Sequence, residues 1–495
     1  MEVNLARLGE DSLQRLGDHP VLCYEGRWYR SGELHERACR VATGLRAIGV
    51  EPGDRVVVFM ANCPEVGIVY SATWRVGAVV TPVIFLISRP ELRHILADSG
   101  AAAVITSPEL LDVAIDATDG RPVPIVVVGD GRSGVVDFTE LERHEPSSIV
   151  ERRGGDLAAL LYTGGTTGRS RGVCLTHANL SHAGAASRAA THVPGVTRGI
   201  SGLPLSHSFG LMVSVGGMHL PEPTTGVLLR WFDATTWLRL AAEHRSQTAT
   251  MVPSTIAMLL ACPLEEYDLT ELRYVYSGAS PLPPAVRSEW VRRVPGSMIL
   301  EGYGCTETAG IATTNPPAAP RHGTVGRPVP GVRIRVVDPS GADVPTGEDG
   351  EVLISGPNVM ARYWDTEQPQ GEWFHTGDVG RLDADGYLTI VDRIKDLIIR
   401  GGYNIYPRDV EDVLTAHPQV AMAAVVGRPD DRLGEEVVAF VSLVPGATLT
   451  PSELVAYAKQ HLAANKYPRE VRILDAIPLT SVLKVDRKVL RARLS

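Results

Sequence analysis

The sequence lacks the features that mark membrane and secreted proteins. No uninterrupted apolar run reaches about 18 residues, so we expect no membrane-spanning helix. The N-terminal segment MEVNLARLGEDSLQRLGDHP is polar and acidic, whereas a secretory signal begins with basic residues and continues with apolar ones. The six cysteines are scattered without a C-x-x-C spacing, which is typical of reduced thiols rather than of disulfides or zinc ligands. These absences predict a cytoplasmic protein.

The sequence also lacks a long basic run, internal repeats and low-complexity segments. Its formal net charge is −9, so we expect no nucleic-acid partner. With 44% hydrophobic and 21% charged residues, its composition is typical of a globular enzyme. At 495 residues the chain is long enough for more than one domain.

The first part of the chain alternates between helical and strand patterns. Apolar residues at helical spacing predict helices over 32–48, 64–75 and 91–97, and β-branched runs predict strands over 55–60, 77–83 and 101–105. Such alternation favours parallel sheets covered by helices, and it continues to about residue 320. We therefore predict an α/β fold with a large N-terminal domain.

The pattern changes after that. Residues 323–392 contain short apolar runs separated by Gly, Pro and Asp, which predicts a small antiparallel β region within the N-terminal domain. The last hundred residues have an α+β pattern of their own, with helices expected over 407–416 and from the capping box at Thr450 to about Leu462, and strands over 420–426 and 437–444. We place the N-terminal domain at 1–392, a hinge at 393–396 and a small mobile C-terminal domain at 397–495.

The segment LYTGGTTGRSRGV, at 161–173, is the most informative motif. Its glycines allow tight turns in which successive N–H groups form an anion-binding nest, and its hydroxyls and Arg171 add further donors. The spacing differs from G-x-x-x-x-G-K-[ST], so this is not the common P-loop. A polyphosphate is the natural ligand, and a polar surface turn is the alternative. The candidate ligand-binding residues are Thr163, Gly164, Gly165, Thr166, Thr167, Gly168 and Arg171.

A second motif, GYGCTETAG, follows the apolar run at 297–300. Gly302 and Gly304 beside Tyr303 form a suitable floor for a flat base. Thr306 and Glu307 can serve a phosphate and Mg²⁺ together, because Mg²⁺ often takes one carboxylate and several waters. The alternative is a turn before a helix capped by Thr306.

Three further positions complete the candidate set. The turn Ser277–Gly278–Ala279 follows an expected strand, and ligands of open α/β sheets bind outside the carboxyl ends of strands. Asp378, with Arg393 at the end of the next strand, is suited to bridge two ribose hydroxyls, whereas Asp383 and Asp385 are more typical of a hairpin turn. On local evidence, His207 is either a core residue or part of a pocket wall.

Taken together in this order, the motifs resemble the ANL adenylate-forming superfamily of acyl-CoA synthetases, adenylation domains and luciferases. The resemblance extends from about Tyr29 to Arg491. It implies that a carboxylate attacks the α-phosphate of Mg·ATP to give an acyl-adenylate and pyrophosphate. The thiol of coenzyme A then attacks the acyl carbon and releases AMP.

The resemblance also implies a role for each motif. Residues 163–168 would hold the β- and γ-phosphates, Thr306 the α-phosphate and Glu307 the Mg²⁺ ion. Tyr303 and the turn at 277–279 would flank adenine, Asp378 and Arg393 would hold the ribose, and His207 would lie beside the acyl carboxylate. Lys484, which local sequence alone suggests is a solvated lysine, would bridge that carboxylate and the α-phosphate. Rotation about a hinge at Lys395 would then replace Lys484 with Gly401, Gly402 and Tyr403, which line the thiol tunnel.

The chain departs from the superfamily pattern Y-T-S-G-T-T-G-x-P-K-G. Gly164 replaces the serine, Ser170 the proline and Arg171 the lysine, while Leu483 replaces the glycine that usually precedes the catalytic lysine. All of these changes concern ATP binding or adenylation, whereas the motif GGYNIYPRDVE of the thioester step is intact. A second hypothesis is therefore that adenylation is weak or lost and that the protein uses acyl-adenylate from a partner enzyme.

The acid itself is predicted only by class. We expect residues 209–218, 278–279 and 302–311 to line its pocket, with Gly210, Gly216 and Gly217 leaving room. Since no ion-pairing residue stands out there, we expect a bulky or extended apolar carboxylic acid. The leading interpretation is an acyl-CoA ligase. A freestanding enzyme that loads an acyl carrier protein and a non-catalytic nucleotide-binding protein are the alternatives.

Overall fold

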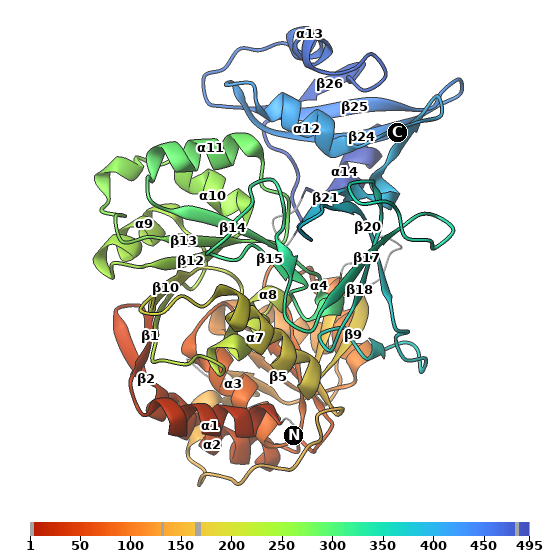
Figure 1. Ribbon diagram of the computed structural model, residues 1–495. Helices are drawn as coiled ribbons and strands as arrows, with labels where there is room; N and C mark the ends of the chain where they lie inside the picture. Colours follow the sequence, from red (N-terminus) through yellow and green to blue (C-terminus); the bar gives the residue numbers. More distant parts are fainter. Residues whose placement is uncertain (1–3, 130–132, 164–169, 481–484, 495) are drawn as a thin grey trace.

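The computed structural model describes residues 4–129, 133–163, 170–480 and 485–494. It shows a large N-terminal domain that contains three sheets and a small C-terminal domain that contains one. In Figure 1 the C-terminal domain stands above the N-terminal domain, next to α11 and β21. The predicted α/β class is confirmed. Among the described helices, none combines the length and the apolar character needed to cross a membrane.

The first sheet has eight strands in the order β19-β9-β8-β4-β3-β5-β6-β7. The strands from β8 to β7 are parallel, and β9 and β19 add antiparallel edges. The strands are β3 (Arg55–Phe59), β4 (Val79–Pro82), β5 (Ala101–Thr106), β6 (Ile125–Val127), β7 (Val136–Asp137), β8 (Leu157–Thr163), β9 (Arg171–Thr176) and β19 (Arg362–Tyr363). The helices of this region are α1 (Leu5–Leu16), α2 (Ser31–Ala47), α3 (Pro64–Arg75), α4 (Arg89–Ser99), η1 (Pro108–Leu110), α5 (Leu111–Thr118) and α6 (Phe138–Glu142).

The second sheet has nine strands in the order β16-β15-β14-β13-β12-β10-β11-β1-β2, with a parallel centre and antiparallel ends. Its strands are β1 (Pro20–Tyr24), β2 (Arg27–Arg30), β10 (Arg198–Ser201), β11 (Thr225–Leu228), β12 (Thr248–Met251), β13 (Tyr274–Ser277), β14 (Met298–Tyr303), β15 (Thr313–Thr314) and β16 (Arg327–Pro328). The helices between them are α7 (His177–Thr191), α8 (Ser208–Gly217), α9 (Ala234–Glu243), α10 (Pro253–Leu260), η2 (Leu264–Glu266), α11 (Pro284–Arg293) and η3 (Thr306–Thr308).

The expected antiparallel β region is the third sheet, in which β17 (Arg333–Val337), β18 (Gly350–Ser355), β20 (Phe374–Leu382) and β21 (Leu388–Arg393) follow one another. The turn between β20 and β21 is the predicted one: the Asp383 carboxylate accepts the N–H groups of Asp385 and Tyr387. This hairpin places Asp378 directly opposite Arg393.

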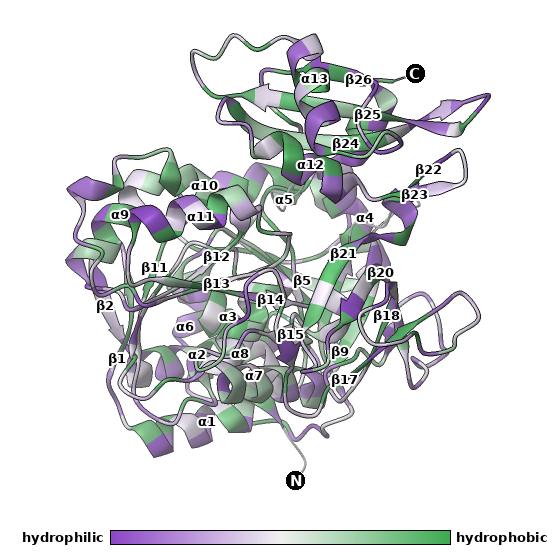
Figure 2. Ribbon diagram, turned by 45° about the horizontal axis from the view of Figure 1, so that its top comes forward, coloured by the Kyte–Doolittle hydropathy of each residue, from purple (hydrophilic) through white to green (hydrophobic). Residues whose placement is uncertain are grey.

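The C-terminal domain packs its helices on a mixed sheet in which β25 pairs with β24, β22 and β26. Figure 2 shows hydrophobic colour along the body of β24 and β25 and hydrophilic colour on α13, as expected for a sheet covered by amphipathic helices. The elements are η4 (Ile394–Asp396), β22 (Ile398–Arg400), β23 (Tyr403–Ile405), α12 (Pro407–Thr415), β24 (Val420–Asp430), β25 (Gly434–Leu443), α13 (Pro451–His461), β26 (Glu470–Ile473) and α14 (Arg487–Ala492).

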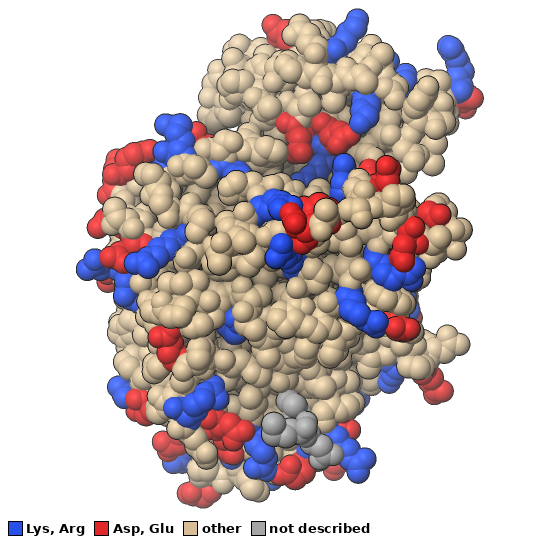
Figure 3. Space-filling view, in the orientation of Figure 1, with Lys and Arg blue, Asp and Glu red and all other residues tan. Residues whose placement is uncertain are grey.

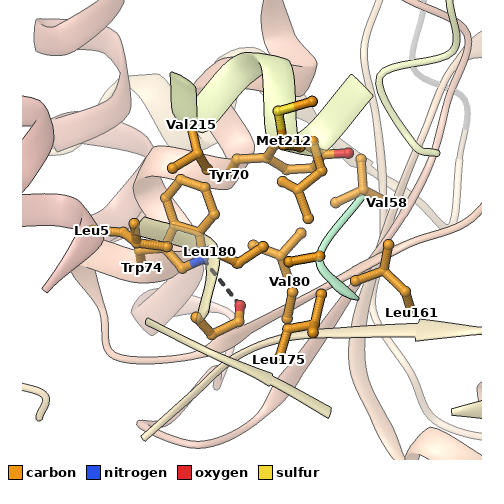
Figure 4. Packing of buried hydrophobic residues seen from close by; sticks show 14 of the residues in the cluster. Leu5, Val58, Tyr70, Trp74, Val80, Leu161, Leu175, Leu180, Met212 and Val215 are labelled. Atoms are coloured by element: carbon orange, nitrogen blue, oxygen red, sulfur yellow. Dashed lines mark hydrogen bonds between the residues drawn. The ribbon is translucent and has the colours of Figure 1, made fainter. Parts of the chain in front are cut away.

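The largest hydrophobic core joins the two large sheets. Tyr70 and Trp74 of α3 pack against Val80 and Leu161 of the first sheet and against Val215 of α8 (Figure 4). The Trp74 indole N–H donates to the Ala158 carbonyl at 3.0 Å, so the most polar atom of this core is satisfied. Strand β8, which leads into the glycine-rich loop, and α8, which follows His207, are therefore held in one rigid core.

Candidate active site

One cleft, with a volume of about 1540 Å³, lies where the three sheets of the N-terminal domain meet the C-terminal domain. It is lined by residues at the carboxyl ends of β8, β13 and β14, where an α/β sheet binds its ligands. The predicted site residues that line it are Thr163, Arg171, His207, Ser277, Gly278, Ala279, Gly302, Tyr303, Gly304, Thr306, Glu307, Asp378, Arg393 and Lys395. Gly164, Gly165, Thr166, Thr167, Gly168 and Lys484 lie outside the described residues.

Asp378, which is buried, lies at the centre of a polar cluster in the cleft. One of its carboxylate oxygens accepts the Tyr303 hydroxyl at 2.6 Å, and the other accepts the Arg393 Nε at 3.0 Å. Burial, together with the Asp378 charge, raises the pKa of Tyr303, so its hydroxyl remains a donor. Each carboxylate oxygen has a second lone pair, so Asp378 can still accept hydrogen bonds from a diol such as ribose.

Glu307 is held by a residue that the sequence patterns did not single out. The hydroxyl of Tyr363, on β19, donates to one carboxylate oxygen of Glu307 at 3.1 Å. Among the described residues, no group of three or more His, Cys, Asp or Glu side chains comes together as a metal site. A single carboxylate beside a phosphate suits Mg²⁺, which commonly takes one or two carboxylates and completes its shell with phosphate oxygens and water.

Arg171 stacks on the same tyrosine. Its guanidinium lies 3.9 Å from the centre of the Tyr363 ring and forms an ion pair of 2.9 Å with Asp365. Both partners of this ion pair are about half exposed, so the pair can open at little cost when a phosphate competes for the arginine. Arg171 thus lines the cleft while Asp365 balances its charge. Like Tyr363, Asp365 was not singled out by the sequence patterns.

The two ends of the glycine-rich loop are paired. Thr163 at the end of β8 lies opposite Arg171 at the start of β9, because these two strands form an antiparallel pair. Ser170 donates to the Glu91 carboxylate, and the His94 ring bonds the Ser170 carbonyl at 3.1 Å. The serine that replaces the usual proline therefore anchors the loop to α4.

His207 and Thr306 meet at the start of α8. His207 is the N-cap of this helix, and its Nδ1 accepts the Phe209 N–H at 3.2 Å. In the neutral ring the proton must then lie on Nε2, which makes that atom a donor. Thr306 begins the single turn of η3, and its hydroxyl lies 3.4 Å from that of Ser208, so the alternative of a longer helix capped by Thr306 is wrong.

The turn after β13 forms another wall. Ala279 has a φ of +70°, and a β-carbon added at Gly278 would be in ordinary van der Waals contact with the Phe209 ring, at 3.5 Å. The Ser277 hydroxyl is buried without a hydrogen-bond partner among the described residues. This turn therefore places an unpaired hydroxyl in the wall of the cleft, beside Tyr303.

The junction of the two domains is charged. Figure 3 shows basic and acidic side chains side by side where the C-terminal domain meets the rest. Asp396 of η4 pairs with Arg491 of α14 at 2.8 Å, and the Arg408 N–H donates to the Asp392 carboxylate at 3.1 Å. Burial, reinforced by the nearby Arg393, lowers the pKa of Lys395. The proposed hinge is thus fixed on both sides by ion pairs and hydrogen bonds.

Among the described residues, the C-terminal domain lines the cleft with one face. Leu479, Thr480, Val485 and Asp486, which flank the segment containing Lys484, line it. Gly401, Gly402 and Tyr403 do not; Tyr403 is 62% exposed on the turn between β22 and β23. The structure therefore brings together the nucleotide-side residues and leaves the predicted thiol-tunnel residues outside.

Two expectations about the acyl side of the cleft are wrong. Gly210 leaves no room for substrate, because an added β-carbon would lie 2.7 Å from the Leu205 α-carbon, and the space at Gly216 is filled by Arg188. Arg188 of α7 also lines the cleft, so the wall does contain an ion-pairing residue. The sequence patterns missed it because one arginine in an otherwise ordinary helix carries no local signal of where it points.

Comparison with known proteins shows the family to which the chain belongs. A family model described as AMP-binding enzyme matches residues 9–364, and its companion for the AMP-binding enzyme C-terminal domain matches residues 409–484. The chain belongs to the AMP-binding enzyme family. It is thus a member of the ANL superfamily, and, like its relatives, an AMP-forming acid–thiol ligase.

The relatives of the ligase act on several kinds of acid. It is 36% identical to a feruloyl-CoA synthase from Amycolatopsis sp., with 93% of each chain covered. It is 35% identical to the fatty acid–[acyl-carrier-protein] ligase ScoC from Streptomyces coeruleorubidus, covering 96% of this chain and 93% of the relative. The structure resembles the anthranilate CoA ligase AuaEII in complex with anthranoyl-AMP, with a TM-score of 0.93, 27% identity and coverage of 100% and 97%.

Proposed function

We propose that the protein is an acyl-CoA ligase that activates a carboxylic acid with a bulky apolar body through an acyl-adenylate. The observation that supports this most strongly is the convergence on one cleft of the Asp378–Tyr303–Arg393 cluster, Glu307 with its tyrosine partner, and His207. These groups are suited to the ribose, phosphate and carboxylate parts of an acyl-adenylate.

In the first step a carboxylate oxygen of the acid attacks the α-phosphorus of ATP, and the bond to pyrophosphate breaks. Asp378 accepts the two ribose hydroxyls and so fixes the nucleotide. Thr306 donates to an α-phosphate oxygen, and Glu307 would hold Mg²⁺. When bound, that ion neutralises the phosphate charge. The His207 Nε2–H donates to the second carboxylate oxygen, which orients the first toward phosphorus.

Lys484 completes this step by bridging the carboxylate and the α-phosphate, where negative charge concentrates in the transition state. In the second step the thiolate of coenzyme A attacks the acyl carbon, and the acyl–phosphate bond breaks to release AMP. Rotation at Lys395 replaces the Lys484 segment with Gly401, Gly402 and Tyr403, which line the entrance for the thiol. One small domain thus serves two reactions with two faces.

The body of the acid lies along α8. Phe209, Met212 and Val213 of this helix, with Ile311 after η3, give the wall its apolar character. Burial of an extended hydrocarbon or aromatic group against them contributes roughly 25 cal/mol per Å² of apolar surface.

Two alternatives are each favoured by one observation. Similarity to ScoC favours an acyl carrier protein as the acceptor in place of coenzyme A. The loop departures favour weakened adenylation, since Ser170, which replaces the usual proline, is bonded to Glu91. In that case a partner enzyme supplies the acyl-adenylate.

One set of assays separates these possibilities. The protein is given a panel of acids with ATP, Mg²⁺ and either coenzyme A or a phosphopantetheinylated carrier protein, and products are identified by mass. In parallel it is given the matching preformed acyl-adenylates with each acceptor. We expect AMP release and an acyl-CoA whose mass equals acid plus coenzyme A minus water. Failure to consume ATP with any acid, together with failure to consume any adenylate, would refute the proposal.

A further inference from the structure

Arg188 has no ion-pair partner among the residues that the structure describes. It lies on α7, close to the end of the helix, and lines the cleft together with Ser187 and Thr191. Its Nε is fully enclosed and has no hydrogen-bond partner among the described residues. The part of the side chain that remains accessible belongs to the cleft wall. The guanidinium is therefore available to a molecule in the cleft.

In the described part of the chain, no acidic side chain balances the charge of Arg188. Its electrostatic neighbour is Tyr276, whose hydroxyl donates to the Thr191 carbonyl at 2.9 Å and whose pKa is raised by burial. His219 lies on the other side, and its pKa is lowered first by burial and also by the Arg15 and Arg188 charges, so this ring is neutral. Burial lowers the pKa of Arg188 too, but a guanidinium stays charged in proteins.

Other largely buried arginines of this chain have the carboxylate partner that Arg188 lacks among the described residues. Arg37 pairs with Glu65 and Glu142, and Arg400 pairs with Glu436 at 2.7 Å. A buried charge without a partner is strongly destabilising, so proteins retain such groups where a ligand supplies the opposite charge. By this reasoning the missing partner of Arg188 is part of the substrate.

The position of Arg188 shows which part of the substrate it meets. A β-carbon at Gly216 would lie 3.1 Å from the Arg188 Nε, so the arginine stem packs over the last turn of α8. His207 caps the first turn of the same helix, and nine residues of helix rise about 13 Å. Between them the wall is apolar, formed by Phe209, Met212 and Val213. The cleft thus has an activation end at His207 and a cationic end at Arg188.

We propose that the substrate is a dicarboxylic acid with an apolar body, whose far carboxylate pairs with Arg188 while the near one is adenylated. This inference rests on the proposed ligase function. A guanidinium is planar and bonds a carboxylate through two parallel N–H groups, which makes the recognition specific for the anion and not only for its charge. The Ser254 hydroxyl, also in the cleft wall and without a described partner, is a further donor.

The test compares acids that differ only at the far end. Suberate and sebacate are paired with octanoate and decanoate, and ferulate, with its neutral phenol, is the third class. Binding is measured by calorimetry in the presence of a non-hydrolysable ATP analogue, and turnover by AMP release with coenzyme A. The variants are Arg188→Met and Arg188→Lys. The control is Arg239→Met, an exposed arginine on α9 that pairs only with its neighbour Glu243.

We expect the wild type to prefer each diacid over its monoacid by on the order of tenfold or more in both binding and kcat/KM. Arg188→Met should abolish this preference, Arg188→Lys should retain part of it, and Arg239→Met should leave it unchanged. The inference would be overturned if the wild type bound and turned over monoacids or ferulate as well as the diacids, and if the Arg188→Met variant showed the same relative preferences as the wild type. The ligase function would stand in that case. Arg188-dependent diacid binding without any AMP release would instead refute the ligase function and support the inference. Absence of both binding and turnover would refute both.

Discussion

At the scale of single side chains, Tyr363 shows how the candidate metal-binding carboxylate is held in place. Its hydroxyl donates to Glu307 at 3.1 Å, while its ring supports the Arg171 guanidinium. Replacing Tyr363 with Phe keeps the ring and removes only the hydroxyl. Because a hydrogen bond to a charged group contributes about 1.5–3 kcal/mol, we expect the Tyr363→Phe variant to lose about tenfold or more in kcat/KM for Mg·ATP.

The measurement is acid-dependent pyrophosphate exchange, which follows the adenylation step alone. Tyr457→Phe is the matched control, because Tyr457 lies on α13, away from the cleft. Equal kinetics for Tyr363→Phe and the control would show that Glu307 needs no support from β19.

A second residue links the fold to pH. His177 is fully buried, and its Nδ1 accepts the Leu5 N–H at 3.2 Å. Burial, with a smaller effect of Arg152, lowers the pKa of His177 from 6.5 to about 4. Below pH 6.5 the unfolded chain therefore takes up a proton that the folded protein excludes, and the free energy of unfolding falls as the pH decreases toward 4.

We expect this histidine to reduce the free energy of unfolding by about 2 kcal/mol between pH 7.5 and pH 5. His177→Asn keeps an acceptor for Leu5 and removes the titration, so the difference between wild type and variant should shrink by that amount at the lower pH. Urea denaturation at the two pH values measures it, with the exposed His461→Asn as control. Parallel pH dependence of wild type and His177→Asn would contradict the expectation.

The residues of the site were predictable where a motif carries them. Tyr303, Glu307, Asp378 and Arg393 lie in recognisable segments, and the structure places them around one cleft, although Asp378 lies within β20 and not at a strand end. Tyr363, Asp365 and Arg188 were not predictable. Each is an ordinary residue in its own segment, and it gains its role only because a distant strand or helix packs against the site.

At the scale of elements, the capping box of α13 is a local prediction that the structure confirms. The Thr450 hydroxyl accepts the Glu453 N–H at 3.3 Å, and the Glu453 carboxylate accepts the Thr450 N–H at 2.8 Å. Thr450→Ala should lower the free energy of unfolding of the C-terminal domain by about 1 kcal/mol, because it leaves N-terminal donors of the helix unsatisfied. Chemical denaturation followed by circular dichroism measures this loss. Ser452→Ala, an exposed neighbour in the first turn, should cost much less, and a similar loss for both would attribute the effect to helix propensity instead.

The same contrast between local and distant information holds for the strands. Helix α3 begins and ends where the sequence predicts, because Pro64 and Arg75 lie within an uninterrupted helical pattern. Strand β24 instead continues to Asp430, beyond the predicted end, since pairing with β25 along its whole length carries it past Gly427 and Pro429. Strand β1 pairs with β11, about two hundred residues further along the chain, which no local pattern can show.

At the scale of the whole molecule, the cleft exists because two domains face each other across a short connection. The larger domain supplies Asp378, Glu307 and His207, and the C-terminal domain closes the cleft with α12, α14 and the residues flanking 481–484. In this arrangement the turn at 401–403 lies outside the cleft. Because Tyr403 is exposed, replacing it should have little effect on the stability of the fold. The two faces of the small domain can therefore be disabled one at a time.

This separation gives the most demanding prediction. Lys484→Ala should suppress pyrophosphate exchange by on the order of a hundredfold or more, because it removes a positive charge from the adenylation transition state. The same variant should convert preformed acyl-adenylate and coenzyme A to thioester at nearly the wild-type rate. Tyr403→Ala should show the reverse pattern, with exchange retained and thioester formation slowed. Rapid-quench measurement of each half-reaction on both variants tests the pair. If each variant lost both half-reactions to the same extent, the two faces would not act separately, and rotation about Lys395 would have no part in the reaction.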